Sequence, residues 1–144
     1  MNIRPIVICI FSNNGRILAV EGYDPTKRQI FYRPLGGGIE FGEFSQDALA
    51  REIREELDTA VTDLRYLATL ENIFTFDGQP GHEIVQVYDG RFEDKTLYRR
   101  PVLKGLEDNG QPFTAFWKSL SDFEGRNAPP LYPDGLLELL RQQL

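Results

Sequence analysis

Apolar residues near the N-terminus form two runs that predict β-strands. Residues 5–11 (PIVICIF) and 16–21 (RILAVE) are rich in β-branched side chains and flank the segment Ser12-Asn13-Asn14-Gly15. Asn14 and Gly15 can both adopt the positive φ that a tight turn between strands requires. The pattern predicts a β-hairpin here, and residues 30–35 (IFYRPL) predict a further short extended segment that ends at Pro34 and a run of glycines.

From residue 45 the apolar spacing changes from that of strands to that of a helix. Apolar side chains recur at helical intervals over residues 45–57, at Ala48, Leu49, Ile53 and Leu57. This spacing predicts an amphipathic helix. Ser45 is a suitable N-cap, and the negative charge of Asp47 is favourable in the first turn.

The second half of the chain adds further strands and a terminal helix. Residues 64–76, 82–91 and 113–118 are strand-like, and Gly78-Gln79-Pro80-Gly81 separates the first two as a hairpin-like turn. Residues 133–144 (PDGLLELLRQQL) predict a helix that turns three leucines toward the core, Leu136, Leu137 and Leu140. We expect a single α+β domain over residues 1–144, with a mixed β-sheet between helices.

Composition narrows the function classes. The chain has 144 residues, of which 41% are hydrophobic and 26% are charged, and its net charge is −6. This size allows one domain with a proper core. The negative charge argues against a surface that wraps nucleic acid, but a bound metal ion would still allow a small phosphorylated ligand.

The lone cysteine and the N-terminus also limit the possibilities. Cys9 lies in an apolar run, so we expect a buried side chain, and with one cysteine no intrachain disulfide forms. The apolar stretch at the N-terminus is too short for a signal peptide or a membrane span, which predicts a cytoplasmic protein without membrane association.

Candidate chemistry lies between the glycine run and the acidic helix. Glu52, Glu55 and Glu56 fall within an arc of roughly 100° on one helix face, where like charges repel. Mg²⁺ and Mn²⁺ prefer carboxylate oxygens and would remove that repulsion. The alternative interpretation is an ordinary solvated helix face on which arginines and glutamates form ion pairs. The residues Gly36-Gly37-Gly38 let the backbone turn tightly and approach another group closely.

The spacing of these residues resembles the signature box of the Nudix hydrolases. Gly37 is followed by five residues, Glu43, seven residues and then the run Arg51-Glu52-Ile53-Arg54-Glu55-Glu56. The box extends to Thr59, but Asp58 and Thr59 depart from the glycine and apolar residue that the pattern has there. Asp58 can still end the helix, because Asp tolerates left-handed backbone. The resemblance implies an α/β/α sandwich around a mixed sheet.

The resemblance also implies an activity, a cofactor and roles for residues. Nudix enzymes hydrolyse the diphosphate linkage of a nucleoside diphosphate joined to another moiety, with Mg²⁺ or Mn²⁺. Here Glu52, Glu55 and Glu56 would hold the metal, and Arg51 would pair with Glu43 to lock the loop to the helix. Substrate binding would involve Arg33 and the backbone of Gly37 and Gly38. Some members use a further acidic residue from a loop as general base. Glu107 is the first candidate for this base and Glu83 is the second. A glutamate of the box is a third possibility.

Alternatives to this hydrolase remain at the level of the sequence. One is a catalytically silent nucleotide-binding or regulatory module of the same fold. Another is an isomerase of isoprenoid diphosphates, which would need a catalytic cysteine and more histidines than the single His82. We expect a small nucleoside diphosphate derivative as the partner and no stable nucleic-acid complex, and a homodimer is compatible with the sequence.

Five aromatic residues are candidates for stacking on a base: Phe31, Tyr32, Phe74, Trp117 and Tyr132.

Overall fold

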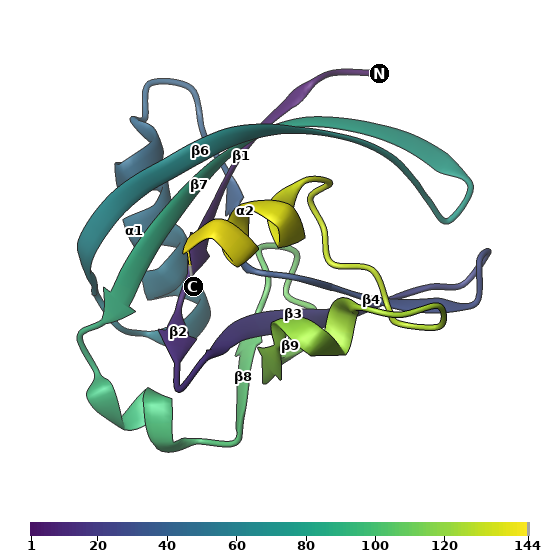
Figure 1. Ribbon diagram of the computed structural model, residues 1–144. Coiled ribbons are helices and arrows are strands. Elements are labelled where there is room, and N and C mark those ends of the chain that lie inside the picture. Colours follow the sequence, from purple (N-terminus) through teal and green to yellow (C-terminus); the bar gives the residue numbers. More distant parts are fainter. Residues whose placement is uncertain (144) are drawn as a thin grey trace.

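Two β-sheets form the centre of the computed structural model, which describes residues 1–143 (Figure 1). The first sheet is mixed, with the order β5 (Leu35–Gly38), β1 (Arg4–Ile10), β7 (Gln79–Phe92) and β6 (Val61–Phe76). The second is antiparallel, with the order β2 (Ser12–Asn13), β3 (Arg16–Asp24), β9 (Pro112–Ser119) and β8 (Val102–Leu106), while β4 (Gln29–Arg33) pairs with β3. The predicted α+β class is confirmed, but the strands divide into two sheets.

Two α-helices and two 3₁₀-helices complete the fold. The helices are α1 (Ser45–Leu57) and α2 (Leu136–Gln143), and the 3₁₀-helices are η1 (Lys95–Arg99) and η2 (Leu120–Phe123). The predicted terminal helix is present with Leu136 and Leu140 buried, although its predicted last residue, Leu144, lies outside the described residues. Within residues 1–143, no helix combines the length and the apolar character that crossing a membrane requires.

Strand β1 explains why the first apolar run has no polar interruptions. Alternate side chains of this segment enter two different core clusters. Val7, Cys9 and Phe11 pack in the cluster that contains the buried face of α1. Ile6, Ile8 and Ile10 pack in the cluster that contains Leu136 and Leu140 of α2. A strand buried on both faces is apolar throughout, as PIVICIF is.

Helix α1 matches the predicted bounds but not the predicted cap. Phe44 occupies the N-cap position without a side-chain hydrogen bond, so the prediction of Ser45 as N-cap is wrong. The Ser45 hydroxyl is instead hydrogen-bonded to the Tyr88 hydroxyl at 2.6 Å. At the other end Asp58 is left-handed, with φ 53° and ψ 44°, and its N–H donates to the carbonyl oxygen of Arg54. The departure from the box pattern at Asp58 therefore leaves the helix exit intact.

The glycine run forms a strand rather than the turn that the sequence suggests. Residues Gly36, Gly37 and Gly38 belong to β5 and pair antiparallel with β1. A Cβ atom built on Gly36 would lie 2.0 Å from the carbonyl oxygen of Val7, and the φ of Gly36 is +154°. The absence of a side chain thus allows β5 to lie unusually close to β1, which places the end of β5 beside α1.

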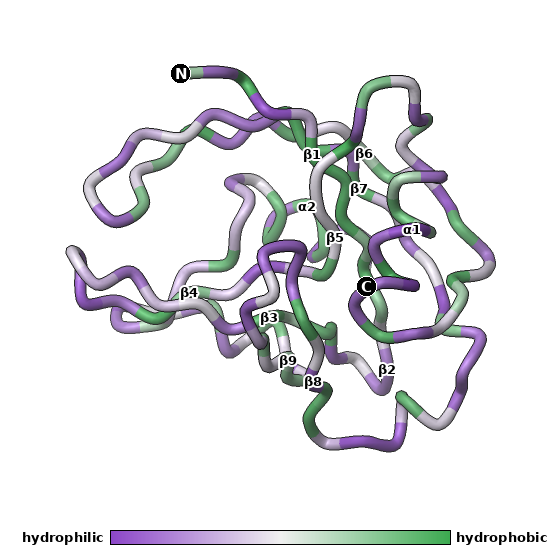
Figure 2. Tube along the Cα trace, turned by 180° about the vertical axis from the view of Figure 1, so that it is seen from behind, coloured by the Kyte–Doolittle hydropathy of each residue, from purple (hydrophilic) through white to green (hydrophobic). Residues whose placement is uncertain are grey.

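Two long hairpins project beyond the core and leave a cleft between them. The hairpins β3–β4 and β6–β7 reach toward each other at their tips, which are largely hydrophilic (Figures 1 and 2). The Thr26 hydroxyl donates to Asp77 Oδ1 at 2.8 Å, and Lys27 Nζ donates to the carbonyl oxygen of Thr75 at 2.8 Å. The enclosed cleft measures about 590 Å³ and extends inward to Glu52 and Glu56 of α1.

Candidate active site

A bidentate ion pair attaches the loop before α1 to the helix. Arg51 Nε donates to Glu43 Oε2 at 2.8 Å, and Arg51 Nη2 donates to Glu43 Oε1 at 2.9 Å. The backbone N–H of Glu40 also donates to Glu43 Oε1. Hydrogen bonds from Arg51 lower the pKa of Glu43 to about 2. The contact expected between these two residues is present, and its planar, charge-assisted geometry is the strongest that an arginine offers.

The same guanidinium group also reaches the acidic face of the helix and the end of β5. Arg51 Nη1 donates to Glu52 Oε1 at 3.1 Å and lies 3.5 Å from Glu55 Oε2. Arg51 Nη2 donates to the carbonyl oxygen of Gly38 at 3.0 Å. One side chain therefore holds the loop, the strand and two of the helix carboxylates in a fixed relation.

Gly37 accommodates the carboxylate of Glu52. The Glu52 residue is only 1% exposed, and a Cβ atom on Gly37 would lie 2.4 Å from its carboxylate carbon. A Cβ atom on Gly38 would meet nothing within 4 Å. Both glycines line the cleft, but only Gly37 is sterically required there. Gly38 contributes its carbonyl oxygen to Arg51.

Three carboxylates converge beside the inner end of the cleft, and one of them was not predicted. Glu52 and Asp108 line the cleft, and the exposed Glu55 lies next to them. Ligand oxygens of Glu52, Glu55 and Asp108 all lie within 4.8 Å of one another. Asp108 belongs to the turn between β8 and β9, where the N–H of Glu107 donates to the carbonyl oxygen of Gln111. The only sequence signal for Asp108 was its position next to Glu107, which drew attention to the loop but not to this residue.

Glu56 lies beside this cluster rather than within it. It lines the cleft, and its Oε1 atom is buried with no hydrogen-bond partner in the described part of the chain. Burial, followed by the negative charge of Glu52, raises the pKa of Glu56 to about 9. Burial and the charge of Asp108 likewise raise the pKa of Glu52 to about 7. An unpartnered buried oxygen among repelling carboxylates fits a site for a divalent cation, and these hard oxygen donors suit Mg²⁺ or Mn²⁺.

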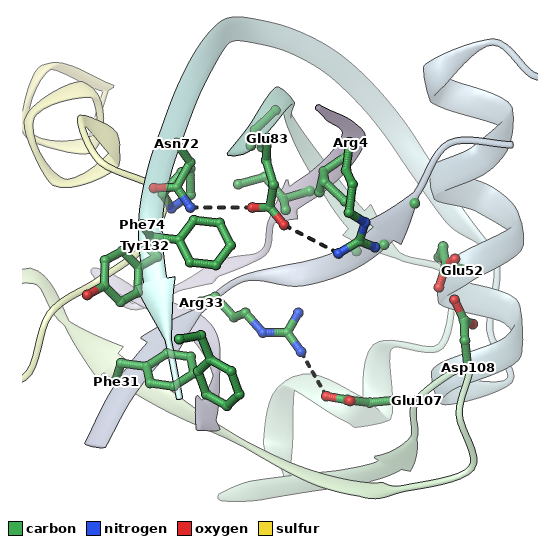
Figure 3. A pocket seen from close by; sticks show the side chains of 18 of the residues that line it. Arg4, Phe31, Arg33, Glu52, Asn72, Phe74, Glu83, Glu107, Asp108 and Tyr132 are labelled. Carbon is green, nitrogen blue, oxygen red and sulfur yellow. Dashed lines mark hydrogen bonds and ion pairs between the residues drawn. The ribbon is translucent and has the colours of Figure 1, made fainter. Parts of the chain in front are cut away.

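Glu107 points away from the carboxylate cluster and toward an arginine. Arg33 Nη2, from β4, donates to Glu107 Oε1 at 2.8 Å (Figure 3). Gly105, two residues before Glu107, lies within β8. A Cβ atom on Gly105 would lie 2.3 Å from the carbonyl oxygen of Glu56. Because Gly105 has no side chain, β8 can pack against the end of α1, and this contact places the turn at residues 107–109 next to the site.

Glu83, the second candidate for a general base, is not brought to the carboxylate cluster. It lies on β7, accepts a hydrogen bond from Asn72 Nδ2 at 3.3 Å and lies 3.7 Å from Arg4 Nη1. Figure 3 shows these three side chains on the opposite wall of the cleft from Glu107 and Arg33. Their position suits contact with a ligand rather than with a metal ion.

The five aromatic candidates divide into two groups. Phe31, Phe74 and Tyr132 line the cleft at the end remote from Glu52 and Asp108 (Figure 3). Tyr32 is buried in the core cluster of α2, and Trp117 donates from Nε1 to the carbonyl oxygen of Arg100, outside the cleft. Three of the five rings are therefore available to a bound ligand.

Comparison with known proteins identifies the family. Residues 1–134 match the family model described as the NUDIX domain, so the chain belongs to the Nudix family. A curated relative, the NAD-capped RNA hydrolase NudC of Mycobacterium tuberculosis (strain ATCC 25618 / H37Rv), is 37% identical over 67 residues, which are 46% of this chain and 21% of that protein. The alignment thus spans about a fifth of the length of the curated relatives that the chain matches.

Solved structures share the fold over nearly the whole chain. A NUDIX hydrolase from Nitrosomonas europaea has a TM-score of 0.68 and 17% identity, and the match covers 99% of this chain and 88% of that one. The MutT NUDIX hydrolase from Burkholderia pseudomallei has a TM-score of 0.67 and 21% identity, with 97% and 98% covered. At these identities the similarity establishes the fold alone.

Replacing Gly37 by alanine tests the fit between β5 and Glu52. The added methyl group must displace the Glu52 carboxylate, so we expect Mn²⁺ affinity to fall roughly 10-fold or more, as when the support of a metal ligand is lost. Titration calorimetry measures the affinity, and Gly38→Ala is the matched control because its methyl group meets open space. Equal Mn²⁺ affinity in the two variants would contradict the proposed steric role of Gly37.

The raised pKa of Glu56 predicts how the stability of the metal-free protein depends on pH. With a folded pKa of about 9 against a usual 4.5, Glu56 favours folding when protonated. Its contribution is complete below about pH 4.5 and is lost as the pH rises toward 9. The melting temperature of the protein in chelator should fall as the pH rises over this range. The Glu56→Gln variant should show a smaller fall between pH 7 and 9, because Glu52, with a pKa of about 7, is already mostly deprotonated there. Exposed Glu55→Gln is the control, and an unchanged profile for Glu56→Gln would refute the assignment.

Proposed function

We propose that the protein is a metal-dependent pyrophosphohydrolase that cleaves the diphosphate linkage of a nucleoside diphosphate joined to another moiety. The observation that carries this proposal is the convergence of Glu52, Glu55 and Asp108 at the inner end of a cleft, with Arg51 holding the helix carboxylates to the preceding loop. A nucleotide-binding module without catalysis would have little need for three converging carboxylates. Membership of the Nudix family supports the same reaction class.

Under this proposal the acidic cluster holds Mg²⁺ or Mn²⁺. Glu52, Glu55 and Asp108 supply ligand oxygens, and Glu56 adds a fourth carboxyl group beside them. When bound, such an ion neutralises diphosphate oxygens and lowers the pKa of a coordinated water. Arg51 and Glu43 act as positioning residues, since they hold the ligand carboxylates without contributing an atom to the reaction.

One wall of the cleft provides a cationic group for the diphosphate. This group is the guanidinium of Arg33, which is paired with Glu107. Phosphate oxygens can replace a carboxylate as the partner of a guanidinium group. The 2.8 Å contact with Arg33 makes Glu107 a positioning residue in this proposal, so a carboxylate of the helix is left as the proton acceptor.

A panel of nucleoside diphosphate derivatives tests the function. Nucleotide sugars, nucleoside triphosphates and dinucleotides would be incubated with Mg²⁺ or Mn²⁺ and monitored for released nucleotide. NAD belongs in the panel, because the curated mycobacterial relative is named for hydrolysis of NAD-capped RNA. Metal-dependent release supports the proposal. Ligand binding without any product would instead support the silent nucleotide-binding module.

Variants of the two neighbouring residues Asp108 and Glu107 distinguish a metal ligand from a residue that only contacts Arg33. Asp108→Asn should lower kcat and also weaken Mn²⁺ binding, because it removes a ligand. Glu107→Gln should change kcat less and leave Mn²⁺ binding intact, because it loosens only Arg33. Exposed Glu71→Gln, on β6, is the matched control for lost negative charge. If Glu107→Gln lowers kcat by roughly 10²–10⁴-fold with unchanged metal affinity, Glu107 is the general base and the positioning role is wrong.

A further inference from the structure

On the wall of the cleft that the first sheet forms, the side chains change along β7 from apolar to polar and then to aromatic. Ile6 and Val85 are paired neighbours and belong to the core. Two residues further along, the next row on the same face contains Arg4, Glu83 and Asn72. The row after that contains Gly81 and Phe74. Because alternate residues of a strand share a face, the core surface passes into a polar row and then an aromatic one at the mouth of the cleft.

Both hairpins use the same device to present a flat aromatic surface. Phe74 pairs with Gly81 across β6 and β7, and Phe31 pairs with Gly22 across β3 and β4. A Cβ atom on either glycine would lie within 2.4 Å of the ring atom Cζ of its partner. Each ring therefore lies over a glycine of the neighbouring strand, an arrangement that fixes the plane of the ring.

These two rings form opposite walls of a slot. They lie on different hairpins and both line the cleft, and Tyr132 supports Phe31 with ring centroids 5.7 Å apart in an edge contact (Figure 3). Planar heterocycles stack on fixed aromatic faces of this kind. The slot is remote from Glu52 and Asp108, and Arg33 lies between the two ends (Figure 3).

The polar row beside Phe74 carries an ordered set of hydrogen-bonding groups. Asn72 is only 4% exposed, and its Oδ1 accepts from the N–H of Asp134 at 3.1 Å while its Nδ2 donates to Glu83. Asn72 is thus committed to holding Glu83 in place. Glu83 offers two acceptor oxygens to the cleft, and Arg4 next to it offers N–H donors. The row therefore presents to the cleft one hydrogen-bond donor group, the guanidinium of Arg4, next to two acceptors, the carboxylate oxygens of Glu83.

We infer that the slot binds a guanine ring, stacked between Phe31 and Phe74, with its Watson–Crick edge against Arg4 and Glu83. Guanine presents a carbonyl oxygen, a ring N–H and an amino group along this edge, which complement a donor and two acceptors. Adenine and cytosine place a ring-nitrogen acceptor where a carboxylate also accepts, and uracil has a single N–H. This inference rests on the proposed function in that the substrate would be a guanine nucleoside diphosphate derivative, with its diphosphate toward Arg33.

Nucleoside monophosphates test the slot without any catalysis. GMP, IMP and AMP would be titrated into the full chain in the presence of a chelator, so that neither a metal ion nor a diphosphate is required. IMP differs from GMP by the amino group alone. GMP should bind roughly 10-fold or more tightly than IMP, since a hydrogen bond to a charged acceptor is lost, and AMP should bind more weakly still.

Variants assign this preference to the residues of the slot. Glu83→Gln should reduce the ratio of GMP to IMP affinity to near 1, whereas Glu71→Gln, elsewhere on the same sheet, should leave the ratio unchanged. Phe74→Leu should weaken GMP and IMP to a similar extent, because stacking does not depend on the amino group. Equal affinities for GMP and IMP in the wild-type protein, or an undiminished ratio in a folded Glu83→Gln variant, would overturn the inference.

The outcome is separable from that of the proposed function. Selective binding of GMP without hydrolysis of any guanine nucleoside diphosphate derivative would refute the hydrolase and retain the guanine slot. Metal-dependent hydrolysis with no preference among bases would retain the hydrolase and refute the slot. The chelated monophosphate titration therefore stands on its own, whichever substrate the enzyme panel identifies.

Discussion

The site depends on the ability of one guanidinium group to hold several acidic groups together. Arg51 contacts both oxygens of Glu43, one oxygen of Glu52 and the carbonyl oxygen of Gly38, and it lies near Glu55. Without this cation, the carboxylates of the helix face would repel one another more strongly in the metal-free protein. Because the guanidinium group is planar and rigid, it also fixes the directions in which these carboxylates point. The loop, β5 and α1 therefore behave as one unit.

The rest of the fold brings other residues to this unit through close backbone contacts. Gly36 lets β5 lie against β1, Gly37 leaves room for Glu52, and Gly105 lets β8 approach the end of α1. The last contact matters most for chemistry, because it places Asp108 beside Glu52 and Glu55. The two hairpins then extend the site outward, from an acidic inner end past Arg33 to an aromatic mouth (Figure 3).

Local patterns in the sequence predicted the parts of this arrangement that lie close together along the chain. The helix over 45–57 follows from the spacing of its apolar residues, and the left-handed Asp58 is compatible with its side chain. The contact between Glu43 and Arg51 follows from the resemblance to the Nudix box. The strand formed by the glycine run was not predicted, because glycine permits an extended backbone as well as a turn. Asp108 was missed because its place depends on the packing of β8 against α1, which no local pattern records. The glycine partners of Phe31 and Phe74 depend in the same way on strand register.

The central claim is that the carboxylates ordered by Arg51 form a divalent metal site at the inner end of the cleft. The most direct measurement is the anomalous scattering from a crystal of the protein soaked in Mn²⁺, which locates the ion without reference to activity. The account predicts a peak bounded by carboxylate oxygens of Glu52, Glu55 and Asp108, at ligand distances of about 2.2 Å for a hard divalent cation. A peak at another place, or none at saturating Mn²⁺, would contradict it.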